Sequence, residues 1–230
     1  YSQNLGKFRL RWEQHTEFCV YTFLQKGKFS EPFVNPIIDL VPSDWLSALP
    51  GEALAAVHFS LESREQIERG AQDLSQLFGG NAVIGSSVSG GGAQVWSDLQ
   101  IHDDGFSRIL IHDNSLTELQ GGRLVQRLLE INAYRLLALL SLPLARQSDP
   151  QIQRMDEELR IITQQLTGEE LEEKNLLDNL SHLASELEEL GARTSYRFNA
   201  TRAYFDIVQS RLEEIRQERI EGLQTFTEFL

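Results

Sequence analysis

The chain has 230 residues, with 34 acidic against 21 basic side chains and a formal net charge of −13. This charge argues against nucleic acid as a partner and against binding of a whole face to an anionic membrane surface. Cys19 is the single cysteine, so an intramolecular disulfide is excluded and a reducing compartment is favoured. The sequence shows no signal peptide and no run long enough to span a bilayer.

Residues 1–117 carry the pattern of an α/β layer domain. Strands are predicted at 7–12, 16–24 and 56–61, from alternation and from β-branched and aromatic residues. Short helices are predicted after Ser43 and from a capping box at Ser63 to about Phe78. A meander with strands near 82–88, 94–101 and 106–112 follows. We expect a mixed, mostly antiparallel sheet of about six strands with flanking helices.

A central connecting helix is predicted within 118–148. The helical pattern is clearest over 121–146. Gly121 and Gly122 stand at the start of this stretch, and Pro143 marks where its regular hydrogen bonding must end or bend. The stretch 136–144 is apolar all round apart from one serine, which predicts a core helix covered on all sides. Asn132 and Arg135 interrupt the apolar face; either they pair locally, or they form a buried polar contact with a partner subunit.

Long helices are predicted for the rest of the chain. Apolar residues at heptad spacing predict a helical hairpin over 149–192, with Gly191 as its C-terminal stop. A stalk-like helix is predicted over 193–230, leading to a C-terminal membrane part outside this sequence. Because the chain ends inside this helical pattern, we expect it to be a piece of a longer protein. The fold class is therefore α+β, with a sheet domain followed by long antiparallel helices.

Two stretches carry a resemblance to a known family. RLRWEQHTEFCVYTF at 9–23 and GRLVQRLLEINAYRLLALLSLPLAR at 122–146 resemble an uncharacterised bacterial family of predicted membrane-anchored proteins of unknown function. The ending GLQTFTEFL at 222–230 is similar to the segment that runs on towards membrane helices in that family. The family in turn is distantly similar in layout to CorA-type divalent-cation transporters. The resemblance implies a CorA-like cytoplasmic domain at the cytoplasmic face of the bacterial inner membrane.

Three functions follow from these observations. The first is the soluble, cytoplasm-facing domain of a membrane-anchored homo-oligomer, as a CorA-like cation transporter or its ion-sensing module. The second is a membrane-anchored scaffold or assembly module that binds a protein partner without transport. The third, an enzyme, is the least favoured, because no catalytic arrangement has a diagnostic spacing. His102 and His112, each followed by Asp, are interpreted as turn residues.

The sequence gives two weak candidate metal sites. Glu13, His15 and Glu17 alternate, so a continuous strand would place all three on one face with the character of metal ligands. A polar strand edge or a bulge at Gln14–His15 is the favoured alternative. Neither a catalytic residue nor a cofactor-binding residue is predicted.

The second candidate is an acidic run at the start of a predicted helix. Its carboxylates fit a low-affinity site for Mg²⁺ or another divalent cation between subunits, whereas solvated carboxylates that complement the helix dipole are the favoured interpretation. These residues are Glu169, Glu170, Glu172 and Glu173. The sequence implies no other cofactor.

The end of the chain suggests a contact between subunits. Leu223, Phe226 and Phe229 continue the apolar track of the predicted stalk helix to its last turns. An exposed strip of this kind predicts a closed homo-oligomer with this helix as its inner contact. The expected partners are therefore further copies of the chain and, through a segment outside it, the membrane.

Overall fold

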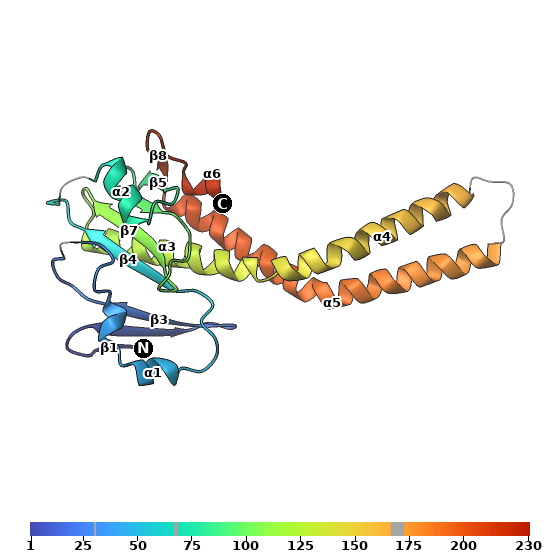
Figure 1. The fold of residues 1–230 in the computed structure, drawn as a ribbon, viewed down its shortest axis with the longest axis horizontal. Helices are drawn as coiled ribbons and strands as arrows, with labels where there is room; N and C mark the ends of the chain where they lie inside the picture. Colours follow the sequence, from blue (N-terminus) through green and yellow to red (C-terminus); the bar gives the residue numbers. More distant parts are fainter. Residues whose placement is uncertain (30, 67–68, 167–172) are drawn as a thin grey trace. The chain divides into compact units, whose positions relative to one another are not determined.

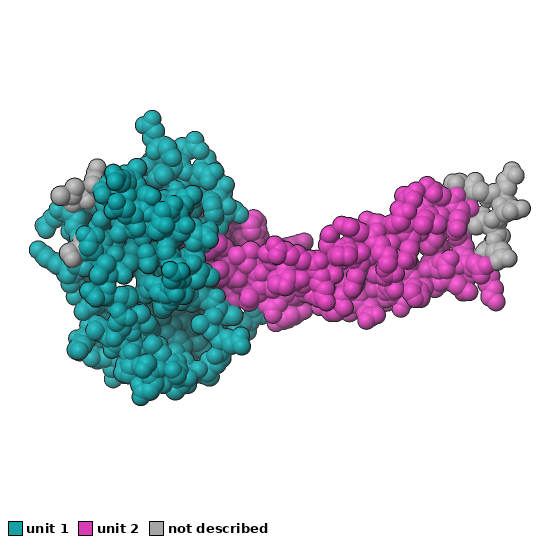
Figure 2. Space-filling view, in the orientation of Figure 1, with its two compact units in different colours: residues 1–126, 215–230 teal, residues 127–214 magenta. Residues whose placement is uncertain are grey.

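The computed structural model describes residues 1–29, 31–66, 69–166 and 173–230. They form two compact units, coloured separately in Figure 2: unit 1 is Tyr1–Gln126 with Ile215–Leu230, and unit 2 is Arg127–Glu214. The chain is α+β, with two mostly antiparallel sheets and a long helical region (Figure 1). The predicted fold class is thus confirmed, although the strands divide between two sheets where one was predicted.

The first sheet is a small antiparallel meander in unit 1. It contains β1 (Ser2–Asn4), β2 (Arg9–Gln14) and β3 (Cys19–Leu24) in that order. The strand predicted from residue 16 begins at Cys19, because the His15 N–H donates to the Phe18 carbonyl (2.8 Å) and closes a turn between β2 and β3. Trp45 of the short helix α1 (Ser43–Ser47) packs edge-on against Phe23, and a 3-10 turn η1 (Ile37–Leu40) precedes it.

The second sheet has the order β4-β7-β6-β5-β8. β4 and β7 are parallel, and the other neighbours are antiparallel. This mixture is the predicted one, but β8 comes from a part of the chain predicted to be helical. The five strands are β4 (Val57–Glu62), β5 (Ile84–Val88), β6 (Ala93–Ser97), β7 (Ser107–Asp113) and β8 (Glu218–Arg219).

A short helix, α2 (Ala71–Leu77), packs on this sheet. It begins eight residues later than predicted, and the Asp73 carboxylate accepts the Gly70 N–H at its N-terminus (3.1 Å). The predicted capping box at Ser63 instead forms a turn, closed by the Gln66 N–H and the Ser63 carbonyl (2.9 Å). The core beneath the helix consists of Leu74, Phe78, Trp96 and Leu110.

The central helix is two helices, α3 (Glu118–Leu139) and α4 (Leu142–Leu166). Thr117 and Gln120 cap α3, so Gly121 and Gly122 lie inside it. Pro143 is the second residue of α4, where its missing N–H costs no helical hydrogen bond. The prediction of a core helix covered on all sides is wrong at this break. Leu139, Leu140 and Leu142 are exposed there.

One helix, α5 (Glu173–Glu214), lies antiparallel to α4 and to the second half of α3. Residues later in α3 and α4 pair with residues earlier in α5, as antiparallel helices require. Arg127 pairs with Glu214, and Arg154 pairs with Glu186 (2.7 Å). Gly191 was predicted to stop a helix but lies inside α5. Gly191 costs about 1 kcal/mol against Ala, and the helix continues through it between buried apolar residues at Leu190 and, further on, at Val208 and Leu212.

The chain after α5 does not continue as a stalk helix, so that prediction for 193–230 is wrong. It forms β8 and the short helix α6 (Phe226–Phe229), both in unit 1. The Gly85 N–H donates to the Gln224 carbonyl (3.0 Å), and a Cβ at Gly85 would lie 2.9 Å from Leu223 Cδ1. The absence of a side chain at Gly85 therefore lets this segment approach β5.

The three residues predicted to form a contact between subunits, Leu223, Phe226 and Phe229, lie in this segment of unit 1. Phe226 is buried in unit 1, with 1% of its surface exposed, and Leu223 packs against the core beneath α2. Phe229 alone of the three is exposed. The three residues therefore do not form an exposed apolar strip, and the argument that placed the subunit contact here no longer holds.

Candidate functional sites

The first predicted metal site is divided by the turn between β2 and β3. Glu13 lies on β2 and pairs with Arg11 (2.7 Å), whereas His15 lies after the strand and stacks on Phe18. Glu17 lies in the turn. The continuous strand that would have placed all three on one face is absent, so the premise of this site is wrong.

The acidic run falls mainly outside the described residues. Glu169, Glu170 and Glu172 are not described, and Glu173 is the first residue of α5. Within the described ranges, the structure contains no group of three or more His, Cys, Asp or Glu residues that could hold a metal ion.

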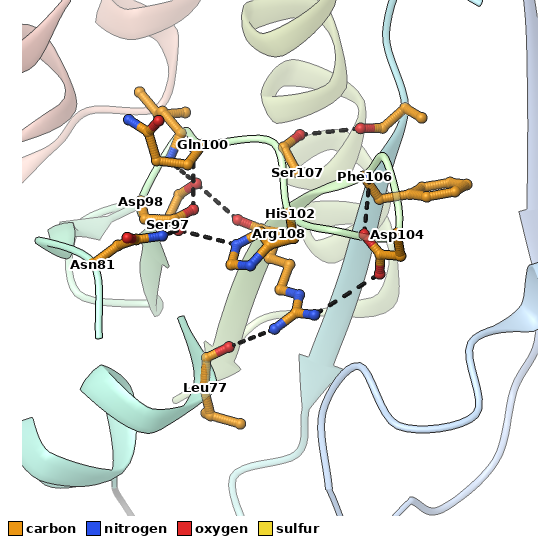
Figure 3. A network of polar contacts seen from close by, with 12 residues as sticks. Leu77, Asn81, Ser97, Asp98, Gln100, His102, Asp104, Phe106, Ser107 and Arg108 are labelled. Atoms are coloured by element: carbon orange, nitrogen blue, oxygen red, sulfur yellow. Dashed lines mark hydrogen bonds and ion pairs between the residues drawn. The ribbon is translucent and has the colours of Figure 1, made fainter. Parts of the chain in front are cut away.

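A buried polar network lies where β6 ends and β7 begins (Figure 3). Asp98 is fully enclosed; its Oδ2 accepts a hydrogen bond from Asn81 Nδ2 (2.8 Å), and its Oδ1 accepts the Gln100 N–H (3.2 Å). His102 Nε2 lies 3.0 Å from the same Oδ2. That distance suits an ion pair, although the direction is off the line of a hydrogen bond. Asp98 thus ties the loop before β5 to the loop before β7.

The backbone beside Asp98 is strained. Leu99 has φ of 50°, in the left-handed region that a bulky side chain rarely adopts. Its N–H donates to Ser97 Oγ (3.0 Å), and that hydroxyl donates in turn to the Arg108 carbonyl (2.7 Å). The Ser107 hydroxyl donates to the Ala56 carbonyl (3.1 Å). Since both hydroxyls are engaged with backbone, this part of the described chain holds positions and offers no histidine-activated nucleophile.

Arg108 and His58 extend the network across β4 and β7. Arg108 donates to the Leu77 carbonyl (2.9 Å), lies 3.8 Å from Asp104 and stands over the Phe33 ring. His58 stacks on Phe106 and lies 3.6 Å from Asp104. Burial lowers the pKa of His58 and Arg108 lowers it further, against the opposing charges of Asp104 and Asp39. The neutral imidazole is therefore the form that the fold favours.

A second buried cluster lies at the opposite end of β4 and β7. Glu62 and His112 are partners in the parallel register, and both are buried. Glu62 Oε1 accepts hydrogen bonds from Arg69 Nε (2.9 Å) and Nη2 (2.6 Å), and this bond raises the pKa of Arg69. The other oxygen, Oε2, lies 3.8 Å from His112 Nδ1 and has no hydrogen bond among the described residues. Arg69 thus fastens the segment before α2 to the end of β4.

The sequence interpretation of the two histidine motifs is confirmed only in part. Asp104 lies in a turn and accepts the Phe106 N–H (3.0 Å), as predicted. His112 and Asp113 instead belong to strand β7, and Asp113, its last residue, accepts the Leu116 N–H (2.6 Å). The buried partners of the histidines, Asp98 and Glu62, were not predicted. An acidic residue at the end of an apolar strand was the one signal available for each, because the contacts themselves depend on strand register.

The helical unit offers a surface of a different kind. Its seam is formed by Met155, Ile162, Leu183 and Leu190, with Leu176 and Leu180 packed against it. Six apolar heptad positions of α4 and α5 are thus packed together. Ile152, Leu159 and Leu187 continue the same heptads but are largely exposed. Both helices therefore keep an apolar edge beside the seam.

Asn132 and Arg135, the two polar residues singled out on the central helix, lie in unit 2. Asn132 is buried, and its side-chain oxygen has no hydrogen bond among the described residues. Burial lowers the pKa of the Arg135 guanidinium. Both observations are consistent with either interpretation of these residues, as a local contact or as a contact with a partner subunit.

The chain belongs to the family described as "Protein of unknown function (DUF3422)", which it matches over residues 1–230. This confirms the resemblance to an uncharacterised family, but membrane anchoring and a link to CorA are not part of the match. No curated protein and no solved structure matches the chain. By length and composition alone, one helical stretch of the described residues, Glu118–Gln165, could cross a membrane. A core helix of a soluble protein has the same composition.

Proposed function

We propose that this chain is an assembly module of a membrane-anchored protein, and that the helices of unit 2 bind another protein chain. One observation carries the proposal: α4 and α5 bury only part of their apolar heptad positions against each other. Soluble proteins rarely leave a continuous apolar edge exposed unless it serves an interaction. The surface of unit 2 is therefore its functional part.

The exposed positions are of the kind that helix–helix contacts use. Leu187 is 59% exposed, although Leu183 and Leu190, four before it and three after it, are buried in the seam. Ile152 and Leu159 have the same relation to Met155 and Ile162 on α4. A third helix laid along this edge would complete the packing that two helices begin.

Anchoring to the bacterial inner membrane, with this chain at the cytoplasmic face, is supported by the resemblance of the stretches at 9–23 and 122–146 to a predicted membrane-anchored family. The presence of one cysteine only, the exposed Cys19, fits a reducing compartment. The apolar composition of 118–165 is compatible with a membrane neighbour.

Cation transport of the CorA kind is the second candidate. The layout of an α+β unit with long helices favours it. The main structural argument for it was a stalk helix running to Leu230, and in its place the chain returns to unit 1 through β8 and α6. A homo-oligomer around that stalk loses the same support, so assembly without transport is the better-supported function.

Photo-crosslinking in membranes tests this proposal. A photoreactive amino acid at Leu187 of the full-length protein should give an adduct of one discrete mass. The same group at Glu189, exposed and two residues further along α5, should give none, because it projects about 200° away. If neither position gives an adduct, the proposal is overturned. Divalent-cation flux in liposomes that carry the purified protein would then favour the transporter.

A further inference from the structure

A row of polar side chains crosses the second sheet of unit 1 from one edge strand to the other. The strand register pairs Glu62 with His112, and His112 with Gln94. It then pairs Gln94 with Ser87, and Ser87 with Glu218 of β8. Because partners in register point to the same face of a sheet, all five side chains project from one face.

This face is the one that α2 covers. Leu110 and Trp96 are also partners in register, and both belong to the core beneath α2. Leu110 lies two residues before His112, and Trp96 lies two residues after Gln94, so the alternation of side chains along each strand places them on the same face. The polar row therefore borders this core, at the end of the sheet where Arg69 binds Glu62.

The row runs from the interior of unit 1 to its surface. Glu62 and His112 expose 1% and 4% of their surface. Gln94 and Ser87 are partly buried, and Glu218 is exposed. The polar groups of the row are therefore within reach of solvent at the β8 end and enclosed at the β4 end.

Much of the hydrogen-bonding capacity of this row is unused within the described chain. Glu62 Oε2 is buried without a hydrogen bond there, and it lies 3.8 Å from His112 Nδ1, too far for a direct hydrogen bond. The side chains of Gln94 and Ser87 make no hydrogen bond with any residue that the structure describes. A buried carboxylate oxygen without a donor is costly, so a donor from outside the chain would stabilise it.

The charge around Glu62 selects a neutral group as this donor. Arg69 donates two hydrogen bonds to Oε1 of Glu62 (2.9 and 2.6 Å) and balances the charge of the carboxylate. A cationic ligand would add an uncompensated charge to a buried site, and an anionic ligand would face the carboxylate. The ligand group that reaches Oε2 is therefore uncharged.

A hydroxyl group suits the pair formed by Glu62 and His112. An oxygen about 2.8 Å from both Oε2 and Nδ1 donates to the carboxylate and accepts from the imidazole in its Nδ1–H tautomer. An amide N–H only donates, so it satisfies the carboxylate alone. Gln94 and Ser87 each donate and accept hydrogen bonds, which suits further hydroxyl groups along the row.

We propose that this row binds a neutral polyhydroxylated small molecule, a sugar or a polyol, with one hydroxyl held between Glu62 and His112. Neighbouring strands lie about 4.8 Å apart, so the row from Glu62 to Ser87 extends over roughly 14 Å. That length offers contacts to several hydroxyl groups of one molecule. The site belongs to unit 1 alone and goes beyond the assembly function proposed for unit 2.

Saturation-transfer NMR on the full chain of 230 residues tests the proposal, with glucose, galactose, myo-inositol and glycerol as separate probes. At least one probe should bind saturably, with a dissociation constant of roughly millimolar order. That probe should shift the imidazole resonances of His112 and leave those of His58, at the opposite end of β4, unchanged. Gln94→Met and Ser87→Ala should each weaken binding roughly tenfold, because each removes a hydrogen-bonding group from the row.

The matched control is Gln76→Met, at an exposed position of α2, which should leave the affinity unchanged. If no probe binds saturably, water alone serves the buried oxygen and the proposal is overturned. Binding that is indifferent to both Gln94→Met and Ser87→Ala, or that shifts the two histidines equally, overturns it as well. None of these results bears on the crosslinking test of unit 2, so the two proposals stand or fall separately.

Discussion

The two units differ in how the chain satisfies its apolar residues. Unit 1 closes its core with segments distant in sequence: β8 and Phe226 join a sheet whose other strands end at Asp113. Unit 2 is held by local helical hydrogen bonds and one seam, and its largest apolar side chains include many that remain exposed. Residues 218–219 thus supply an edge strand of the sheet in unit 1. The helical pair, by contrast, keeps exposed apolar side chains, on which the proposed binding surface rests.

The largest expected effect concerns the closure of unit 1. Phe226→Ala should lower the free energy of unfolding by about 3–5 kcal/mol, because the side chain is almost fully buried and its removal leaves a cavity. Phe229→Ala, at a residue 43% exposed in the same helix, should change it by less than about 0.5 kcal/mol. Chemical denaturation measures both. Equal effects of the two substitutions would contradict the separation of these residues into core and surface.

Much of this fold could be predicted from the sequence, where the determinants are local. Alternation predicted β2, turn residues predicted the β5–β6–β7 meander, and heptads predicted the α4–α5 hairpin. The errors arose where a distant contact overrides a local signal. Gly191 is a good helix stop by itself, yet α5 continues through it. The apolar residues after Glu214 resemble a helix, but they pack on β5.

The buried clusters could not be predicted for a related reason. Glu62 and His112 are fifty residues apart, and they meet because β4 and β7 pair in one parallel register. A shift of one residue would turn His112 to the other face of the sheet. Asp98 and Asn81 likewise meet only once β6 is placed beside β5. In both cases the residue types suggest polar contacts, but the partners are fixed by tertiary structure.

The second expected effect tests whether Glu62 belongs to the architecture of unit 1. Glu62→Ala should destabilise the unit by about 3 kcal/mol, because it leaves the Arg69 guanidinium, largely buried, without its carboxylate. In Glu62→Ala/Arg69→Met, part of the loss should return, since the uncompensated charge is removed. Denaturation of the single and double variants gives the coupling energy, and strictly additive losses would show that the pair does not act as a unit.

The third prediction compares a buried and an exposed leucine of unit 2. Leu183→Ala should cost about 2–3 kcal/mol because the side chain is in the seam, with 8% of its surface exposed. Leu187→Ala, one turn later on α5, should cost less than about 0.5 kcal/mol in a dilute solution of the chain. A loss at Leu187 as large as the loss at Leu183 would place Leu187 in the fold and not in a contact surface.

The smallest effect is a pH dependence that should belong to unit 1 through His58. Its pKa in the fold is lowered from the usual 6.5, first by burial, so between the two values the unfolded chain binds the proton and the folded chain does not. Stability then rises with pH across this window and is lost as the pH falls below about 6.5 towards the folded pKa. His58→Phe keeps a ring against Phe106 and removes the titration. Its free energy of unfolding, measured between pH 7.5 and 5.5, should therefore depend less on pH than that of the wild type; an equal or steeper dependence would show that the imidazole of His58 does not carry the acid sensitivity.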